Sequence, residues 1–196
     1  MRLVATLGCA LALAPVAAAA QPLDTTGATE CQVRGWANDT DPKGTNVRSA
    51  PRADAPIIGR LAPLSNIGGD TWTGVEFEIV AYKDGWLLIR DGDPRDGLKL
   101  DAGHEGDGRG WISAKLVGVQ LRVPAFRSAP RSDAPEVAHL MGNDWGPGSV
   151  GVSAVHSCQG PYIEVTATPI GGKPVRGWSY KPCSSQLTTC DGGITE

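Results

Sequence analysis

The chain has 196 residues, a formal net charge of −3 and no long run of basic residues. This charge balance argues against a surface that binds nucleic acid by releasing counterions. Glycine (26 residues) and proline (15 residues) are abundant, and no long helical pattern follows residue 20, so we expect short strands joined by turns.

The first twenty residues have the features of a secretion signal. Arg2 supplies a positive charge, an apolar stretch continues to Val16, and four alanines end at Ala20. Small residues three and one positions before a cut suit signal peptidase, so cleavage is expected after Ala20. The apolar run is too short to span a membrane. The sequence therefore predicts an exported chain, periplasmic or secreted, and a lipoprotein signal at Cys9 is the less favoured alternative.

Removal of the signal leaves four cysteines, Cys31, Cys158, Cys183 and Cys190. An even number in an exported chain predicts two disulfides. A zinc site is disfavoured, because zinc ligands come in close pairs and six residues separate Cys183 from Cys190. We favour the pairs Cys158–Cys183 and Cys31–Cys190. The pairs Cys31–Cys158 and Cys183–Cys190 stay open.

The first half of the mature chain predicts several short strands. Residues 76–80 alternate polar and apolar side chains, as in a half-buried strand, and Asp84-Gly85 is a hairpin turn signal. Pro51 and Pro56 exclude a regular strand between them. The expected strands lie at 46–48, 57–61, 76–80, 86–90 and 110–112, with a further turn or strand at 115–117. Turns or loops are expected at 39–44, 49–56 and 91–108.

The chain contains an internal repeat. Residues 47–61 (VRSAPRADAPIIGRL) return as residues 126–140 (FRSAPRSDAPEVAHL), with nine of fifteen positions identical. The tryptophan segments at 85–89 and 109–112 also have counterparts in the second half, in the same order. Each half is therefore one unit of about 75 residues. Five short, evenly spaced strands in a unit predict a small β-barrel.

The first unit resembles the bacterial SH3 domain, called SH3b. Residues 46–51 (NVRSAP) resemble its opening motif and residues 110–112 (GWI) its closing motif. The second unit departs from the pattern at Phe126, where valine is usual, and at Tyr162, where tryptophan is usual. The resemblance covers residues 31–185. It implies an all-β chain of two tandem SH3-like small β-barrels, stabilised by disulfides.

The expected domain organisation follows from the repeat and the resemblance. The segments are a signal peptide at 1–20, an N-terminal tail at 21–30, a first SH3b-like barrel at 31–118, a second at 119–185, and a C-terminal tail at 186–196.

The resemblance also implies a binding function. Many SH3b domains are similar to targeting modules for peptidoglycan or its peptide cross-bridges, and they often accompany a hydrolase. Two barrels and two tails account for the mature chain here. We therefore expect a non-catalytic module whose partner is a cell-wall peptide or glycan, or an envelope protein. The alternative is a protein–protein interaction partner, such as an inhibitor or accessory subunit of an exported enzyme.

Catalytic and metal-binding patterns are weak in this sequence. His104, His139 and His156 have no partners at a recognisable motif spacing. The acidic segment 91–97 offers oxygen ligands for calcium, but Arg95 fills a ligand position and no glutamate closes the loop. The sequence therefore predicts no enzyme activity, no metal and no cofactor.

Five residues are candidates for ligand contact. Trp72 and Trp145 lie among glycines on polar segments, where core packing explains an aromatic side chain less easily. Tyr82 adds a further aromatic ring. Arg48 and Arg127 occupy the same place in both repeats, where a guanidinium can bind a carboxylate of a wall peptide. Bracing of the proline loop, through backbone carbonyls or through Asp54 and Asp133, is the favoured role of these arginines. Core packing is expected of Trp86, Trp111 and Trp178.

Overall fold

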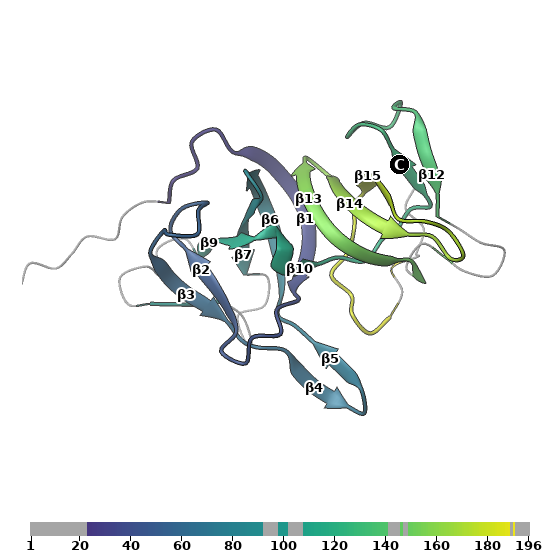
Figure 1. Cartoon of the computed structure of the whole chain (residues 1–196). Coiled ribbons are helices and arrows are strands. Elements are labelled where there is room, and N and C mark those ends of the chain that lie inside the picture. The colour runs from purple at the N-terminus through teal and green to yellow at the C-terminus, as the bar shows by residue number, and fades with distance from the viewer. Residues whose placement is uncertain are drawn as a thin grey trace, which may run out of the picture.

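The computed structural model describes residues 23–91, 98–101, 108–140, 146, 149–188 and 190. Within these residues the regular structure consists of β-strands and one 3-10 turn, arranged as two larger sheets and a separate two-stranded hairpin (Figure 1). The all-β class expected from the sequence is confirmed.

The first sheet has eight antiparallel strands in the order β10-β1-β6-β7-β9-β2-β3-β8. No pairing between the edge strands β10 and β8 closes it within the described residues. A 3-10 turn at Ala114–Leu116 precedes the last strand. The strands are β1 (Thr29–Ala37), β2 (Thr45–Arg48), β3 (Ile57–Leu61), β6 (Glu76–Lys83), β7 (Trp86–Asp91), β8 (Lys99–Leu100), β9 (Arg109–Ser113) and β10 (Val117–Gly118).

The centre of this sheet follows the expected alternation. Phe77, Ile79 and Ala81 on β6 are buried, while the residues between them are partly exposed. The hairpin from β6 to β7 turns at Asp84 and Gly85, which have positive φ angles of 49° and 83°. These angles suit a tight hairpin and explain the Asp-Gly pair.

The second sheet has five strands in the order β12-β11-β15-β14-β13. All of its pairings are antiparallel. The strands are β11 (Ala125–Arg127), β12 (Glu136–His139), β13 (Gly151–Gln159), β14 (Tyr162–Thr168) and β15 (Val175–Tyr180).

The internal repeat is visible in the strand register. In the first sheet Arg48 of β2 pairs with Trp111 of β9. In the second sheet Arg127 of β11 pairs with Trp178 of β15. The opening and closing motifs of each repeat thus become neighbours, although more than fifty residues separate Arg127 from Trp178 in the sequence.

The proline loops of the two repeats have the same backbone hydrogen bonds. Ser49 N donates to the carbonyl of Pro56 at 3.0 Å, and Ser128 N donates to that of Pro135 at 2.9 Å. Proline has no N–H to offer a ladder, so these loops bulge from the sheet and close on themselves. Similar sequence therefore produces similar local structure in both halves.

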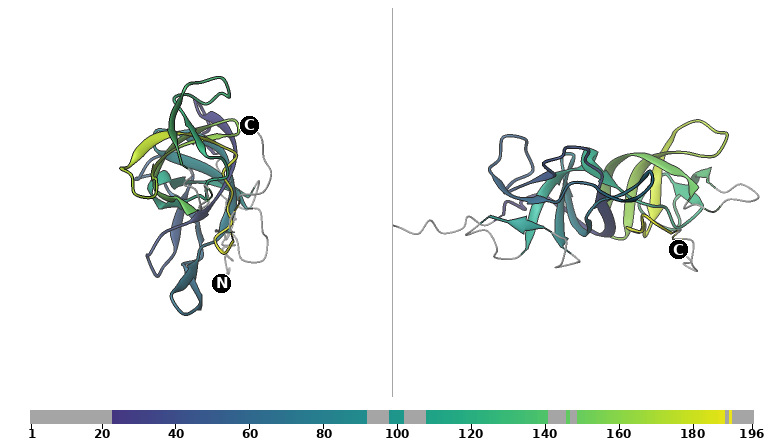
Figure 2. Two further views of the ribbon diagram at one scale, coloured as in Figure 1. Left: turned by 90° about the vertical axis from the view of Figure 1, so that its right-hand side faces the viewer. Right: turned by 90° about the horizontal axis from the view of Figure 1, so that it is seen from below.

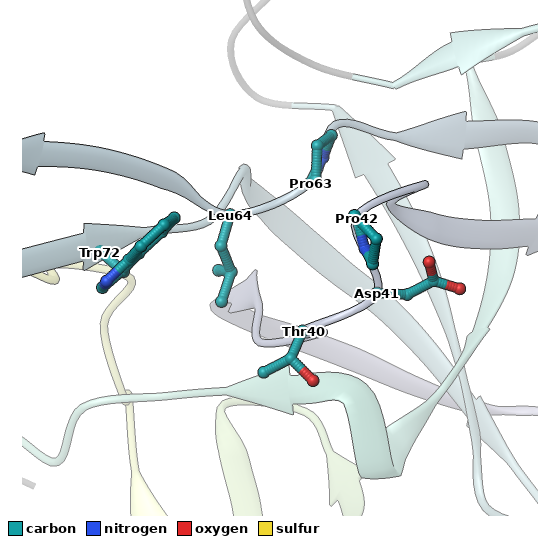
Figure 3. A pocket seen from close by; sticks show the side chains of 6 residues that line it. All are labelled: Thr40, Asp41, Pro42, Pro63, Leu64 and Trp72. Carbon is teal, nitrogen blue, oxygen red and sulfur yellow. The ribbon is translucent and has the colours of Figure 1, made fainter.

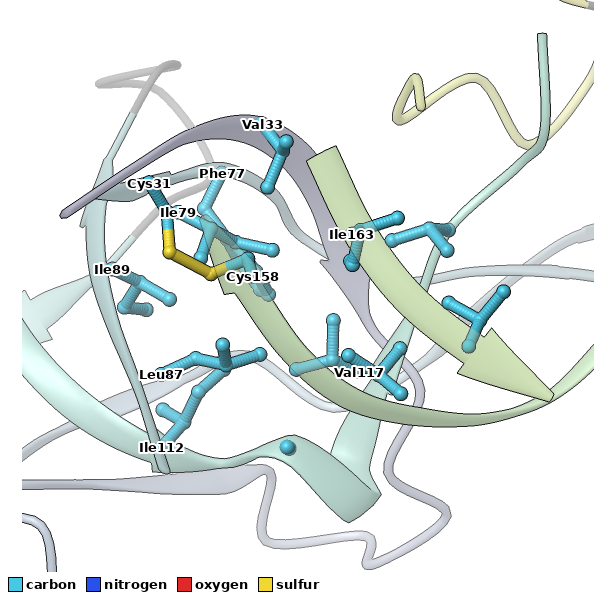
Figure 4. Packing of buried hydrophobic residues seen from close by; sticks show 14 of the residues in the cluster. Cys31, Val33, Phe77, Ile79, Leu87, Ile89, Ile112, Val117, Cys158 and Ile163 are labelled. Carbon is cyan, nitrogen blue, oxygen red and sulfur yellow. A yellow bond between two sulfur atoms is a disulfide. The ribbon is translucent and has the colours of Figure 1, made fainter. Parts of the chain in front are cut away.

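The two sheets lie side by side and share one hydrophobic core (Figure 2). Val33 of β1 and Phe77 of β6 belong to the same buried cluster as Cys158 of β13 and Ile163 of β14 (Figure 4). Apolar burial is the main favourable contribution to folding, so a continuous core holds the two halves together as one body.

The disulfides are Cys31–Cys158 and Cys183–Cys190, so the pairing favoured from the sequence was wrong. The reason is the contact between β1 and the end of β13. Gln32 N donates to the carbonyl of Gly160 at 2.7 Å, and Gly160 N donates to that of Glu30 at 2.8 Å. These bonds bring the Cα atoms of Cys31 and Cys158 to 5.6 Å, a normal disulfide separation.

The chain after β15 packs against the segment that joins β10 to β11. Gln120 and Cys183 form an antiparallel bridge, with N–H to carbonyl distances of 3.0 and 2.9 Å. Arg122 Nε donates to the carbonyl of Cys190 at 3.1 Å. We call residues 183–190, of which residue 189 lies outside the described set, the C-terminal strap.

Candidate functional site

The candidate site is an open groove of about 490 Å³ in the first half of the chain. It lies between the hairpin β4–β5 and the loop that joins β1 to β2 (Figure 3). We call it the Trp72 groove. The residues that line it are Thr40, Asp41, Pro42, Pro63, Leu64 and Trp72.

The hairpin consists of β4 (Ser65–Gly68) and β5 (Thr71–Thr73) and projects from the body of the molecule (Figure 1). Its turn is built by Asn66, whose side-chain oxygen accepts from Gly68 N at 2.9 Å and whose amide donates to the carbonyl of Gly69 at 2.8 Å. Gly68 and Gly69 have positive φ angles, which glycine adopts without strain. Sequence reasoning missed this hairpin, because its strands are short and carry little apolar alternation.

Trp72 has 56% of its surface exposed to solvent. It pairs with Asn66 across the hairpin, so their side chains share the hairpin face that borders the groove. Leu64 lies beside it, between Trp72 and the 40–42 segment (Figure 3). A large aromatic ring with this exposure gains little from burial in the fold itself, and its face is accessible to a ligand.

The opposite wall of the groove is a short braced loop. Asp39 Oδ1 accepts from Asp41 N at 3.0 Å, and Asp41 Oδ1 accepts from Lys43 N at 2.9 Å. Gly44 N donates to the carbonyl of Asp41 at 2.8 Å, and Asp39 Oδ2 accepts from the hydroxyl of Thr45 at 3.2 Å. The turn predicted at 39–44 is confirmed. Its internal hydrogen bonds hold the wall of the groove in one conformation.

The C-terminal strap supports the base of the hairpin. Gln186 Oε1 accepts from Gly74 N at 2.7 Å, and its Nε2 donates to the carbonyl of Gly74 at 2.9 Å. Ser184 donates its hydroxyl to Glu76 Oε2 at 2.6 Å. The N–H and the carbonyl of Gly74, the residue that follows β5, are therefore both hydrogen-bonded to Gln186, which is more than one hundred residues away in the sequence.

The other face of the hairpin borders a second hollow. Side chains alternate across a strand, so Ile67 and Thr73 point away from the face of Trp72. They line this hollow together with Pro63, Val75 and Lys99. Ile67 is 53% exposed. The projecting hairpin therefore carries an exposed apolar side chain on each of its two faces.

Of the residues predicted to contact a ligand, Trp72 is the one that lines the groove. Tyr82 of β6 pairs with Thr29 of β1. It lies six residues beyond Glu76, which is about 20 Å along the strand from the base of the hairpin. Its hydroxyl accepts from Gly85 N at 3.1 Å, and its ring packs against the core. Trp145 lies outside the described residues.

The repeat arginines brace their loops. Arg48 donates to the carbonyl of Ala55 at 2.7 Å, and Arg127 donates to that of Ala134 at 3.1 Å. These are the backbone contacts of the structural role favoured from the sequence, and neither arginine lines the Trp72 groove. A direct role of either residue in ligand binding stays a prediction.

The tryptophans on strands differ in burial. Trp111 is fully buried, with Ala81 and Leu88, in a smaller cluster on the other face of the sheet. Trp86 and Trp178 are partly buried. The expected core role is confirmed in full for Trp111.

No cluster of histidine, cysteine or acidic residues in the described ranges can hold a metal ion. His104 and the acidic segment 92–97 lie outside those ranges. His156 donates or accepts a hydrogen bond with the Thr166 hydroxyl at 2.8 Å. Burial, with a smaller contribution from the Arg176 guanidinium, lowers the pKa of His156 below its ordinary value of 6.5.

Among the described residues, the structure contains no helix that is long and apolar enough to cross a membrane. Comparisons of the chain with family models, with curated proteins and with solved structures find no match.

Proposed function

We propose that this protein is an exported, non-catalytic binding module of the cell envelope and that its ligand is the peptide portion of peptidoglycan. The Trp72 groove carries the proposal. It combines an exposed aromatic ring with two prolines and a leucine, and one of its walls is preorganised by hydrogen bonds. Extended peptides bind in aromatic-lined grooves, because apolar contacts act over several residues of the ligand.

We also propose that each half of the chain is an SH3-like unit. Support comes from the motifs of the resemblance to SH3b domains. The opening motif of each repeat pairs with the Gly-Trp strand that closes it, through Arg48 with Trp111 and Arg127 with Trp178. The two disulfides support export, because disulfides persist in oxidising compartments outside the cytosol.

The groove belongs to the first unit alone in this proposal. Residue 47 aligns with residue 126 in the repeat, so residues 40–42 correspond to 119–121. Val119 and Leu121 are 3% and 0% exposed, and both belong to the shared core. The segment that forms a ligand-facing wall in the first unit therefore has a structural role in the second. We expect one ligand site per chain.

Co-sedimentation of the oxidised mature chain, residues 21–196, with purified peptidoglycan sacculi tests the proposal. Trp72→Ala should weaken binding about tenfold or more, because a tryptophan that contacts the ligand commonly contributes a large share of the affinity. Trp72→Phe should retain most of the binding, since it keeps an aromatic face. Urea unfolding curves should be nearly unchanged, because the side chain is exposed.

Ile170→Ala is the matched control. Ile170 is 54% exposed and lies in the second unit, outside the groove. This variant should sediment like the wild type. The proposal fails if wild-type protein stays in solution at physiological salt, or if the Trp72→Ala and Ile170→Ala variants lose binding equally.

A second function is favoured by the opposite face of the hairpin. A projecting hairpin with Ile67 on one face and Trp72 on the other fits a cleft in a partner protein, as an inhibitor or accessory subunit requires. Ile67→Ala separates the two functions. A wall ligand in the Trp72 groove tolerates this change, whereas a partner that encloses the hairpin loses affinity with both the Ile67 and the Trp72 substitutions.

A further inference from the structure

One charged side chain, Asp41, lines the Trp72 groove, whose other lining residues are apolar apart from Thr40. It lies at the end of the groove opposite Trp72, with Leu64 and the two prolines between them (Figure 3). A ligand that fills this groove therefore meets an apolar surface along most of its length and a carboxylate at one end.

The carboxylate of Asp41 has one oxygen available. Oδ1 accepts from Lys43 N. Within the described part of the chain Oδ2 accepts no hydrogen bond and Asp41 forms no ion pair, whereas the two oxygens of the neighbouring Asp39 are both used, by Asp41 N and the Thr45 hydroxyl. The loop thus leaves one acceptor oxygen, with its negative charge, at the outer end of the groove, where Figure 3 draws the carboxylate directed away from Leu64 and Trp72.

This arrangement selects among cationic groups. A guanidinium binds a carboxylate best as a two-pronged fork that uses both oxygens. A primary ammonium is a compact charge that needs one acceptor oxygen. Oδ1 keeps a second lone pair beside its bond to Lys43 N, but a guanidinium fork would have to share that oxygen with the loop, whereas an ammonium needs Oδ2 alone. The geometry therefore favours an ammonium over a guanidinium. An alkyl stem next to that ammonium matches the apolar contacts offered by Leu64 and Pro42.

We infer that the Trp72 groove recognises a free primary amine on a peptide of the cell wall, carried at the end of an alkyl side chain, and that Asp41 is the residue that binds it. This inference rests on the proposed function. It identifies the chemical group of the wall peptide that the groove recognises. Walls whose peptide amines are free then bind more tightly than walls whose amines are blocked.

The experiment compares untreated sacculi with sacculi whose amines have been acetylated. Acetylation removes the positive charge of an amine and leaves the peptide in place. Wild-type protein should bind the acetylated walls about fivefold to tenfold more weakly. Asp41→Asn should show the same loss on untreated walls and no further loss on acetylated walls, because each change removes the same interaction.

Asp41→Asn is a conservative substitution here, since the amide oxygen of asparagine can still accept the hydrogen bond from Lys43 N. The matched control is Asp133→Asn, which also removes one negative charge. Asp133 is exposed in the second unit, where it forms an ion pair with Arg131. This control should respond to acetylation as the wild type does.

The outcomes separate this inference from the proposed function. If Trp72→Ala weakens binding but Asp41→Asn binds untreated walls as tightly as the wild type, the recognition of an amine is wrong and the groove remains the site. If acetylation weakens wild type and Asp41→Asn equally, the amine acts elsewhere and the role of Asp41 is wrong. If wild-type protein binds no wall, the proposed function itself fails.

Discussion

The two disulfides should differ strongly in their contribution to stability. Cys31–Cys158 closes a loop with a sequence separation of 127, and Cys183–Cys190 one of 7. The entropy that a crosslink removes from the unfolded chain grows with the logarithm of loop length. This relation gives about 5 kcal/mol for the first bridge and about 2.4 kcal/mol for the second.

The perturbation is the double replacement of each pair by alanine. Cys31 and Cys158 are 2% and 1% exposed and lie in the shared core. Alanine is the appropriate substitute there, because the hydroxyl of serine would be buried without an assured partner. Loss of the core bridge also removes some apolar packing, which adds to the entropic effect.

Equilibrium unfolding in urea, followed by tryptophan fluorescence under non-reducing conditions, measures both losses. With a slope of about 2 kcal/mol per molar urea, the midpoint should fall by about 2.5 M without Cys31–Cys158 and by about 1 M without Cys183–Cys190. Equal losses, or a larger loss for the Cys183–Cys190 variant, would refute the assignment of stability to loop length.

Three further predictions concern the hairpin base and His156. Gly74→Ala should lower the free energy of unfolding, measured by thermal denaturation, by about 2 kcal/mol or more, because a Cβ there overlaps the carbonyl oxygen of Ala37. Gly151→Ala is the control and should be nearly neutral, because open space surrounds its Cβ. Gln186→Ala should speed amide hydrogen exchange at Gly74 about tenfold, because it removes both hydrogen bonds between Gln186 and the Gly74 backbone. An unchanged exchange rate would exclude Gln186 as an anchor of the hairpin base. The pKa of His156, measured by NMR titration, should lie below 6.5. The unfolded chain then binds more protons than the folded chain, so the free energy of unfolding should fall as the pH drops below about 6.5. The His156→Gln variant should lack this loss.

Local features of the sequence predicted much of the fold. The Asp84-Gly85 turn, the alternating strand around Ile79 and the proline loops of the repeats depend on neighbouring residues, and the structure contains each of them. The repeat likewise predicted the same strand pairing in both halves. The structure contains the equivalent pairs Arg48–Trp111 and Arg127–Trp178.

The candidate site was predictable in part. Trp72 was identified because glycines surround it and core packing did not explain it. Its partners in the groove were not identified, because Asp41 and Leu64 come from loops whose approach depends on the sheet between them. The hairpin that carries Trp72 escaped detection, since its turn is made by the side chain of Asn66 rather than by an apolar pattern.

By itself, the sequence determined the strand-rich class, the two-unit repeat and the turns, because these follow from backbone preferences and side-chain spacing within short segments. The tertiary structure decided the disulfide pairing, the position of the C-terminal strap and the groove. Each of these depends on which surfaces of distant segments pack together. The hydrophobic effect that drives such packing is non-directional, so a local pattern of residues does not specify its outcome.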